Sequence, residues 1–445
     1  MTRTDSAATT TLPPPLLLML GAVVTAGLTG LAHSLSTALA AGEELAELTD
    51  AAGLQRLPEG PELLVVAAAD RSRLSRTLRE FAEGGSPANA VPCRGQVGPQ
   101  AVWCFGGHGG QWPGMGRELL LSAPVFRDTI DEIDALVSAE AGFGVRRILE
   151  EADAAQYERI DRIQPVTFAY QVALARWLLA AGVRPAAVVG HSVGEVAAAH
   201  ISGALPLPDA VRVICLRSRL LARSSGGRGA MVSVGLSAPE VEMRTGPAGG
   251  RLSVAVYASP AETVVTGDAD RVDRLIAELE PAGVRCRRIR IDAASHSHLV
   301  DDVLEELSAG AAGLRVGKPD IPWVSTVVPG PDGALADAAY WVRNLRGPVR
   351  LLQAVTELAL DGRRLFLEIG PHGLLTSSIR DTLVGLGIRD ARLVATCRRQ
   401  TSERLSLLKT IGTLHASGVE VNMSAAASLG RTYCVQAPMD LDREG

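Results

Sequence analysis

The chain has 445 residues, of which 47% are hydrophobic and 21% are charged. At roughly 100–200 residues per domain, this length predicts two to four compact units, and the composition excludes a disordered or collagen-like protein. The formal net charge of −5 argues against a nucleic-acid or anionic-membrane partner, because such binders carry a basic excess. The six cysteines form no C-x-x-C pair and the eight histidines no H-E-x-x-H motif, so we expect reduced thiols, a cytoplasmic location and no metal site.

The N-terminal segment is apolar and allows two interpretations. No charged residue occurs between Asp5 and Glu43, which is compatible with a targeting segment. However, the apolar stretch is too long for a leader, and prolines and polar side chains interrupt the ~20 residues that a membrane helix needs. We favour a strand at Leu16–Leu20 followed by a helix, in which Leu28, Leu31, Leu35 and Leu39 recur at helical spacing.

A small α/β unit is predicted next. The run Glu62–Ala67 is typical of a buried strand, and a helix follows from about Ser72 to Glu83. Turn-forming residues from Gly84 to Pro99 predict a linker, with a domain boundary near residue 98. Residues 1–98 are therefore expected to form an N-terminal tail and a small α/β linker domain.

The rest of the chain predicts an α/β core with an insertion. Buried strands are expected at Ala101–Phe105, Pro185–Val189, Leu365–Ile369 and Leu393–Ala395. Residues 229–293 show the order β-α-β-β-α-β, which is typical of a ferredoxin-like subdomain. We expect residues 99–228 and 294–400 to form an α/β-hydrolase-like core, and residues 401–445 to supply a C-terminal helix and a final linker.

The segment Gly190-His191-Ser192-Val193-Gly194 carries the sharpest chemical signal. It is a G-x-S-x-G motif that follows an apolar strand and precedes a helix, the context of a nucleophile elbow. The glycines allow a tight turn that projects the serine hydroxyl beside the N–H groups of the helix. The alternative is an ordinary glycine-rich turn that carries a structural serine.

A serine nucleophile needs a base, and His296 is the best candidate. It lies in the loop that leaves the predicted insertion, and sites collect at such domain junctions. No acid between Ser192 and His296 is an obvious partner for the imidazole, which counts against a lipase or esterase. Arg217, about one helix after the elbow, can clamp a carboxylate with its guanidinium.

These residues resemble the malonyl-CoA:acyl carrier protein transacylases, and specifically the acyltransferase domains of polyketide synthases. The resemblance covers about residues 16 to 440 and includes the linkers before and after such domains. Because no ketosynthase precedes it, the chain resembles a discrete, trans-acting enzyme. The segments that carry the resemblance are Phe105–Gly116, Gln164-Pro165, Gly190–Glu195, Leu216–Arg219, Ser295–Ser297, Tyr340–Arg346, Glu368–His372 and Arg431–Gln436.

The resemblance implies roles for individual residues. Ser192 and His296 would form a catalytic dyad in which a backbone carbonyl near Gly347 orients the imidazole. The backbone N–H groups of His108 and Val193 would form an oxyanion hole, although His108 stands where the family usually has glutamine. Arg217 would bind the carboxylate of the substrate. The substrate pocket would include Gln164, Ala293 and Ser295.

The leading hypothesis is ping-pong acyl transfer without a metal or a bound cofactor. A malonyl-type group would pass from its CoA thioester to Ser192, and then to the phosphopantetheine thiol of an acyl carrier protein of a polyketide synthase. We expect a monomer. The alternatives are an α/β-hydrolase acting on thioesters and a decayed acyltransferase that serves only as a docking module.

Two finer expectations concern the carrier and the acyl group. Carrier proteins are generally acidic, so Arg285, Arg287 and Arg288 form a candidate docking patch; a solvated edge strand is the alternative. Val193 resembles malonyl-selective members, whereas Ala294-Ser295-His296 resembles methylmalonyl-selective ones. Ala293 stands where the latter usually place tyrosine and leaves room for a larger branch. We therefore expect methylmalonyl or a bulkier alkylmalonyl group to load at least as well as malonyl.

Overall fold

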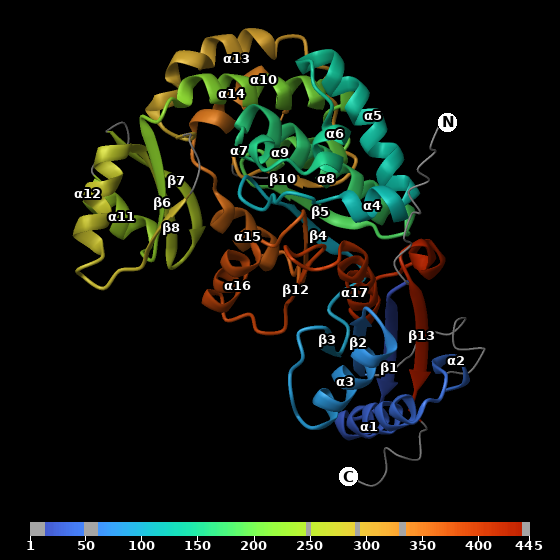
Figure 1. The fold of residues 1–445 in the computed structure, drawn as a ribbon. Coiled ribbons are helices and arrows are strands. Elements are labelled where there is room, and N and C mark those ends of the chain that lie inside the picture. Colours follow the sequence, from blue (N-terminus) through green and yellow to red (C-terminus); the bar gives the residue numbers. More distant parts are fainter. Residues whose placement is uncertain (1–13, 49–60, 246–250, 290–293, 329–334, 438–445) are drawn as a thin grey trace, which may run out of the picture. The chain divides into compact units, whose positions relative to one another are not determined.

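The computed structural model describes residues 14–48, 61–245, 251–289, 294–328 and 335–437 (Figure 1). The chain divides into two compact units. One consists of Met1–Gln96, Arg404–Ala416 and Met423–Gly445, and the other of Val97–Glu403 and Ser417–Asn422.

The smaller unit is built on a four-stranded sheet of order β13-β1-β2-β3. β1 pairs with β2 in antiparallel and with β13 in parallel orientation, so it is an interior strand. The strands of this unit are β1 (Leu16–Ala22), β2 (Glu62–Ala68), β3 (Ala90–Arg94) and β13 (Arg431–Gln436). Its helices are α1 (Thr25–Ala41), α2 (Leu45–Leu48), α3 (Arg71–Ala82), α17 (Glu403–Ala416) and the 3-10 helix η2 (Met423–Ser428).

The burial of β1 explains why the N-terminal segment is so apolar. Leu17, Leu18 and Leu20 are fully buried, and α1 adds Leu28, Leu35 and Leu39 to the same core. The strand and helix predicted from Leu16 onward are thus confirmed. None of the helices in the described part of the chain combines the length and apolarity that a bilayer crossing needs.

Two strands of this unit differ from the sequence-based expectation. The segment from Gly84 to Pro99, predicted to be a linker, contains β3, which forms the edge of the sheet. An edge strand tolerates a proline such as Pro92, which explains why a proline-containing segment could form one. The final segment, predicted to be a linker, contributes β13 beside β1, a pairing between residues more than 400 positions apart.

The larger unit contains a five-stranded parallel sheet of order β10-β5-β4-β11-β12. Figure 1 shows α8 and α9 on one side of it and α15 and α16 on the other, the layered α/β arrangement that the sequence predicts. The strands are β4 (Ala101–Phe105), β5 (Pro185–Gly190), β10 (Trp323–Val324), β11 (Leu365–Ile369) and β12 (Arg392–Ala395). The helices are α4 (Arg117–Ser122), α5 (Pro124–Ala141), α6 (Val145–Glu151), α7 (Ala154–Glu158), α8 (Ile160–Ala180), α9 (Gly194–Ile201), α10 (Leu207–Ser225), η1 (His298–Val303), α13 (Leu304–Gly310), α14 (Ala338–Arg346), α15 (Leu351–Leu360) and α16 (Thr376–Gly385).

The predicted ferredoxin-like insertion is confirmed within this unit. Its elements follow the order β-α-β-β-α-β and form an antiparallel sheet of order β7-β8-β6-β9. The subdomain bonds to the core where Tyr257 donates its N–H to the Val349 carbonyl at 2.9 Å. The elements are β6 (Gly229–Val234), α11 (Ala238–Thr245), β7 (Leu252–Ser259), β8 (Glu262–Asp268), α12 (Ala269–Leu279) and β9 (Cys286–Ile289).

Replacement of a buried β1 leucine should selectively weaken the smaller unit. Leu18 is fully buried, so Leu18→Ala is expected to lower the free energy of unfolding by about 2–5 kcal/mol through lost burial and a residual cavity. Val23→Ala is the matched control, because Val23 is 48% exposed. Hydrogen exchange of the β1 amides measures the effect. Equal protection in the two variants would contradict the interior placement of β1.

Candidate active site

Ser192 lies on a sharp turn between β5 and α9. Its φ is 54°, in the left-handed region that residues other than glycine seldom adopt. A Cβ at Gly190 would lie 2.3 Å from the Cα of Glu195. A Cβ at Gly194 would lie 2.2 Å from the carbonyl oxygen of Phe105. Both glycines are therefore required for this turn, which presents the serine at the carboxyl edge of the sheet.

His296 approaches Ser192 from the segment that precedes η1. Its Nε2 lies 2.9 Å from the Ser192 Oγ, and its Nδ1 lies 2.7 Å from the carbonyl oxygen of Gly347. A carbonyl only accepts, so Nδ1 carries the proton and Nε2 is free to accept one from the serine. The backbone is fixed as well, because the His296 N–H donates to the Leu345 carbonyl at 2.9 Å.

The imidazoles around Ser192 are neutral at neutral pH. Burial, and then the charge of Arg217, lowers the pKa of His296 from 6.5 to about 3, while the bond to Gly347 raises it. Burial also lowers the pKa of His191 to about 4, and burial followed by the Arg217 charge does the same for His108. His296 is therefore in the form that can act as a base.

Arg217 is a buried cation beside the serine. It is 1% exposed, and its Nη2 donates to the Ser192 Oγ at 3.3 Å. Its Nε donates to Asn344 Oδ1 at 3.0 Å and its Nη1 to Gln164 Oε1 at 2.9 Å. Within the described residues no carboxylate forms an ion pair with it, so its positive charge is available to an anionic ligand.

Two backbone N–H groups near the serine have no acceptor among the described residues. They belong to His108, in the glycine-rich loop after β4, and to Val193, just before α9. The loop is held in place by Gln171, whose Nε2 donates to the Gly106 carbonyl at 2.8 Å. Free N–H donors beside a nucleophile are the components of an oxyanion hole.

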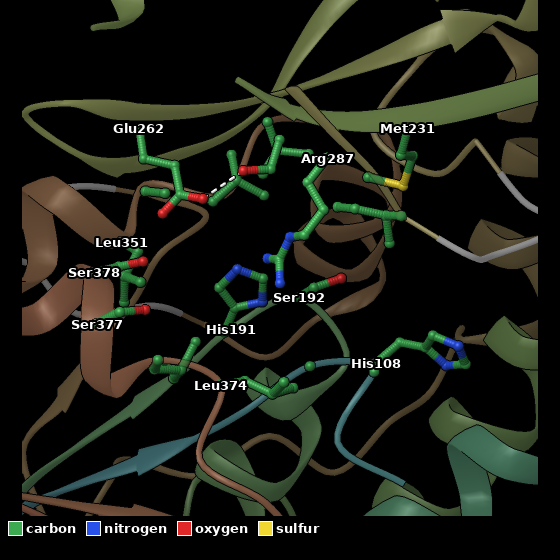
Figure 2. Close-up of a pocket in the computed structure, with 18 of the residues that line it drawn as sticks. His108, His191, Ser192, Met231, Glu262, Arg287, Leu351, Leu374, Ser377 and Ser378 are labelled. Carbon is green, nitrogen blue, oxygen red and sulfur yellow. Dashed lines mark hydrogen bonds between the residues drawn. The ribbon is translucent and has the colours of Figure 1, made fainter. Parts of the chain in front are cut away.

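A cavity of about 460 Å³ extends from Ser192 between the core and the ferredoxin-like subdomain. Figure 2 shows the Arg287 side chain extending from the subdomain toward His191 and Ser192. Part of the wall is polar, where Ser233 donates a hydrogen bond to Glu262. The apolar part of the wall consists of Met231, Val256, Ala258, Val264, Ile289, Leu351, Leu374 and Leu375.

Of the three residues predicted to line the substrate pocket, the structure places one in the cavity wall. Ser295 lines this cavity, whereas Gln164 contacts Arg217 behind the serine. Ala293 lies in the stretch 290–293, outside the residues that the structure describes. The described residues contain no group of three or more His, Cys, Asp or Glu side chains that could bind a metal ion.

The three arginines of the expected docking patch do not all face the same way. Arg287 and Arg288 both line the cavity. Arg287 pairs in register with Ser233, another lining residue, whereas the Arg288 side chain forms an ion pair with Asp273 on α12. Successive side chains of a strand point to opposite faces, so Arg287 and Arg288 on β9 face opposite ways, while Arg285 precedes the strand and does not line the cavity. Arg285 and Arg287 form no ion pair within the described residues.

Comparison with known proteins places this geometry in a family. The family model of the acyl transferase domain matches residues 102–421. The chain is 41% identical over 403 residues, 90% of its length, to a mycocerosic acid synthase-like polyketide synthase of Mycobacterium tuberculosis. The chain belongs to the acyltransferase domains of polyketide synthases. It spans about a quarter or less of the length of the curated relatives it matches, 19% in this case.

Solved structures of acyltransferase domains match most of the chain. The domain from module 8 of the salinomycin polyketide synthase matches with a TM-score of 0.84 and 35% identity, covering 92% of this chain and 98% of that one. The acyltransferase domain of SpnD, in complex with 2-(pent-4-yn-1-yl)malonyl, matches with a TM-score of 0.79 and 32% identity, covering 94% and 98%.

Two residues of the acyltransferase site were missed by sequence reasoning. Asn344 donates its Nδ2 to the Ser192 carbonyl at 3.0 Å while its Oδ1 accepts from Arg217. Glu195, fully buried, accepts from Trp323 Nε1 at 2.7 Å and from Thr326 N at 2.6 Å, which ties α9 to β10. Both residues lie in segments that carried the family resemblance, and that was the only available signal.

The reactivity of Ser192 should persist in mild acid. Because the pKa of His296 is lowered to about 3, its neutral form is retained as the pH falls, whereas a histidine of pKa 6.5 would be almost fully protonated by about pH 5. The rate of Ser192 modification by a fluorophosphonate should therefore change less than about twofold between pH 7 and about pH 5. If the rate of modification instead falls with a midpoint near pH 6.5 while circular dichroism shows an intact fold, the assignment of His296 as a buried neutral base is contradicted.

Proposed function

We propose that this acyltransferase moves a malonyl-type group from CoA to the phosphopantetheine thiol of an acyl carrier protein through an acyl-Ser192 intermediate. The observation that carries the proposal is the buried Arg217, which lies beside the Ser192–His296 pair and has no carboxylate partner among the described residues. The polyketide synthases among the relatives support the assignment to polyketide biosynthesis.

In the first half-reaction, Ser192 Oγ attacks the thioester carbonyl carbon and its proton passes to His296 Nε2. The carbonyl oxygen becomes an oxyanion, which the N–H groups of His108 and Val193 stabilise. Each such donor contributes about 10²–10³ in rate. The C–S bond then breaks, the CoA sulfur takes the proton from His296, and the acyl group remains on Ser192 as an ester.

In the second half-reaction, the carrier thiol gives its proton to His296 and its sulfur attacks the ester carbonyl. The oxyanion forms in the same place, the C–O bond to Ser192 breaks, and His296 returns the proton to the serine oxygen. The Gly347 carbonyl keeps the imidazole in the correct tautomer and orientation throughout. The two half-reactions need no metal and no bound cofactor.

Loss of Arg217 should remove the preference for acyl groups that carry a carboxylate. Charge-assisted hydrogen bonds contribute roughly 1.5–3 kcal/mol each, so Arg217→Ala is expected to slow Ser192 loading from methylmalonyl-CoA about 100-fold or more. Arg219→Ala is the matched control, because Arg219 is two residues further along α10 and its side chain is 63% exposed. The rate is read as the mass of the intact Ser192 adduct.

The same assay tests the reaction class. Wild-type protein should form a stable adduct that a phosphopantetheinylated carrier protein discharges. Rapid loss of the adduct to water would favour a thioesterase, and the absence of any adduct on folded protein would refute acyl transfer.

The cavity beside Ser192 favours acyl groups with a branch at the second carbon. Its volume of about 460 Å³ and its apolar wall leave room for a branch larger than a methyl group. A related acyltransferase domain was solved with a pentynyl-substituted malonyl group. An apolar pocket discriminates by only ~1–3 kcal/mol per methylene, so broad selectivity among alkylmalonyl groups is expected.

Competition between CoA thioesters measures this selectivity. With equimolar malonyl-, methylmalonyl- and ethylmalonyl-CoA, the methylmalonyl and ethylmalonyl adducts of Ser192 together should at least equal the malonyl adduct. Ala293 stands where methylmalonyl-selective members of the family usually place tyrosine, so Ala293→Tyr is expected to shift the balance toward smaller groups. An exclusively malonyl adduct in the wild type would contradict the proposed pocket.

Arg287, rather than the whole arginine cluster, is the best candidate for contact with the acidic carrier protein. Its side chain extends toward Ser192 (Figure 2) and has no ion-pair partner among the described residues. Arg288 also lines the cavity, but it forms an ion pair with Asp273. Charges around a binding surface chiefly change encounter rates, so their effect should appear in carrier kinetics and not in serine loading.

Charge reversal on the two neighbouring arginines separates their roles. Arg287→Glu should raise the Michaelis constant for the carrier protein about tenfold and leave the rate of Ser192 loading within about twofold, whereas Arg288→Glu should have a smaller effect on the carrier. Both are measured by discharge of preloaded acyl-enzyme. Equal effects of the two variants would contradict the assignment of Arg287.

A further inference from the structure

Among the residues that the structure describes, the guanidinium of Arg217 is held by neutral groups alone. Its three described partners are the amide oxygens of Gln164 and Asn344 and the hydroxyl of Ser192. Gln164 is 3% exposed and Asn344 1%, so both bonds lie in the interior. A buried arginine is usually stabilised by a carboxylate, and here two buried amides occupy the positions that a carboxylate would take.

The orientation of the Asn344 amide is fixed by its second bond. Its Nδ2 donates to the carbonyl oxygen of Ser192 at 3.0 Å, which leaves Oδ1 to accept from Arg217 Nε at 3.0 Å. The same side chain therefore joins the cation on α10 to the strained backbone of the nucleophile, where φ is 54°. Gln164 reaches the opposite side of the guanidinium from α8.

We infer that Gln164 and Asn344 are positioning residues that set the charge class of the acyl group. Their neutral oxygens fix the guanidinium without cancelling its charge, so that the charge is left for the carboxylate of the substrate. Asn344 also holds that charge at a fixed place relative to Ser192. This inference rests on the proposed function and adds to it the residues that enforce a dicarboxylic acyl group.

The physical argument makes a specific claim about acidic replacements. A glutamate at 164 or an aspartate at 344 would keep an oxygen acceptor on Arg217, but would form an internal ion pair with it. A substrate carboxylate would then meet a neutralised arginine and a nearby negative charge, both of which disfavour its burial. A neutral acyl group has no such penalty.

Methylmalonyl-CoA and propionyl-CoA form the matched substrate pair, because they differ only by the carboxylate. The measured quantity is the ratio of the two single-turnover rates of Ser192 loading, read by intact mass, with rate constant and half-saturation concentration determined separately. The variants are Gln164→Glu, Asn344→Asp and Asn344→Leu. Gln171→Glu is the control, because Gln171 is also a buried amide of α8, at 2% exposure, but bonds to Gly106 instead of Arg217.

Each variant has a distinct expected result. Gln164→Glu should lower the ratio about 10- to 100-fold while propionyl loading stays within about threefold of wild type. Asn344→Asp should lower the ratio similarly and also slow both substrates, because an oxygen replaces the N–H that bonds to Ser192. Asn344→Leu should slow both substrates without the full change in ratio. Gln171→Glu should slow both substrates, because it loses the Nε2 donor to the Gly106 carbonyl, but it should keep the wild-type ratio.

A wild-type ratio in both Gln164→Glu and Asn344→Asp, with melting temperatures that show folded protein, would overturn the inference. An equal loss of ratio in Gln171→Glu would overturn it too, because any buried acid would then suffice. If Asn344→Asp does not fold, Gln164→Glu decides alone. Failure of the wild type to load methylmalonyl at all would overturn the proposed function and the inference with it, which is a different outcome.

Discussion

A buried positive charge without a counter-charge is the constraint on which the site depends. After burial, the Arg217 charge is the next cause that lowers the pKa of His296. Arg217 contacts the Ser192 hydroxyl, and among the described residues it is held by amides and that hydroxyl alone. Burial lowers its own pKa to about 10, so it stays charged at neutral pH. Such a charge is costly in the free protein, and under the proposed function the carboxylate of the acyl group reduces this cost on binding. Under the proposed function, that binding also weakens the Arg217 charge as one of the causes that lower the pKa of His296, after burial and beside His191, which would link recognition of the substrate to catalysis.

Backbone hydrogen bonds of the larger unit fix the positions of the reacting groups around Arg217. The segment from the end of α14 to the start of α15 is central. The Leu345 and Gly347 carbonyls fix His296, and the Val349 carbonyl accepts from Tyr257 on β7 of the subdomain. The next residue, Arg350, donates its N–H to the Thr326 carbonyl, and Thr326 in turn donates to Glu195 at the start of α9. A continuous set of hydrogen bonds therefore joins the subdomain, the base and the nucleophile helix, so the cavity wall and the reacting pair are positioned by the same backbone.

Local signals predicted much of this arrangement. The strand and helix at the N-terminus, the β-α-β-β-α-β insertion and the turn at Ser192 each depend on periodicity or on glycines within a short window, and all three are present. The pairing of β13 with β1 and the strand β3 inside an expected linker depend on partners distant in sequence, which a local pattern does not contain. Asn344 was missed for the same reason. Strand alternation could have separated Arg287 from Arg288, because adjacent residues of β9 must face opposite ways.

The structure of the acyl-enzyme formed with methylmalonyl-CoA tests the central claim most directly. The account predicts a carboxylate within hydrogen-bonding distance of the Arg217 guanidinium, with Gln164 and Asn344 still bonded to it and the ester oxygen facing the N–H groups of His108 and Val193. A carboxylate that lies instead against Arg287 at the mouth of the cavity, with no group compensating Arg217, would contradict it.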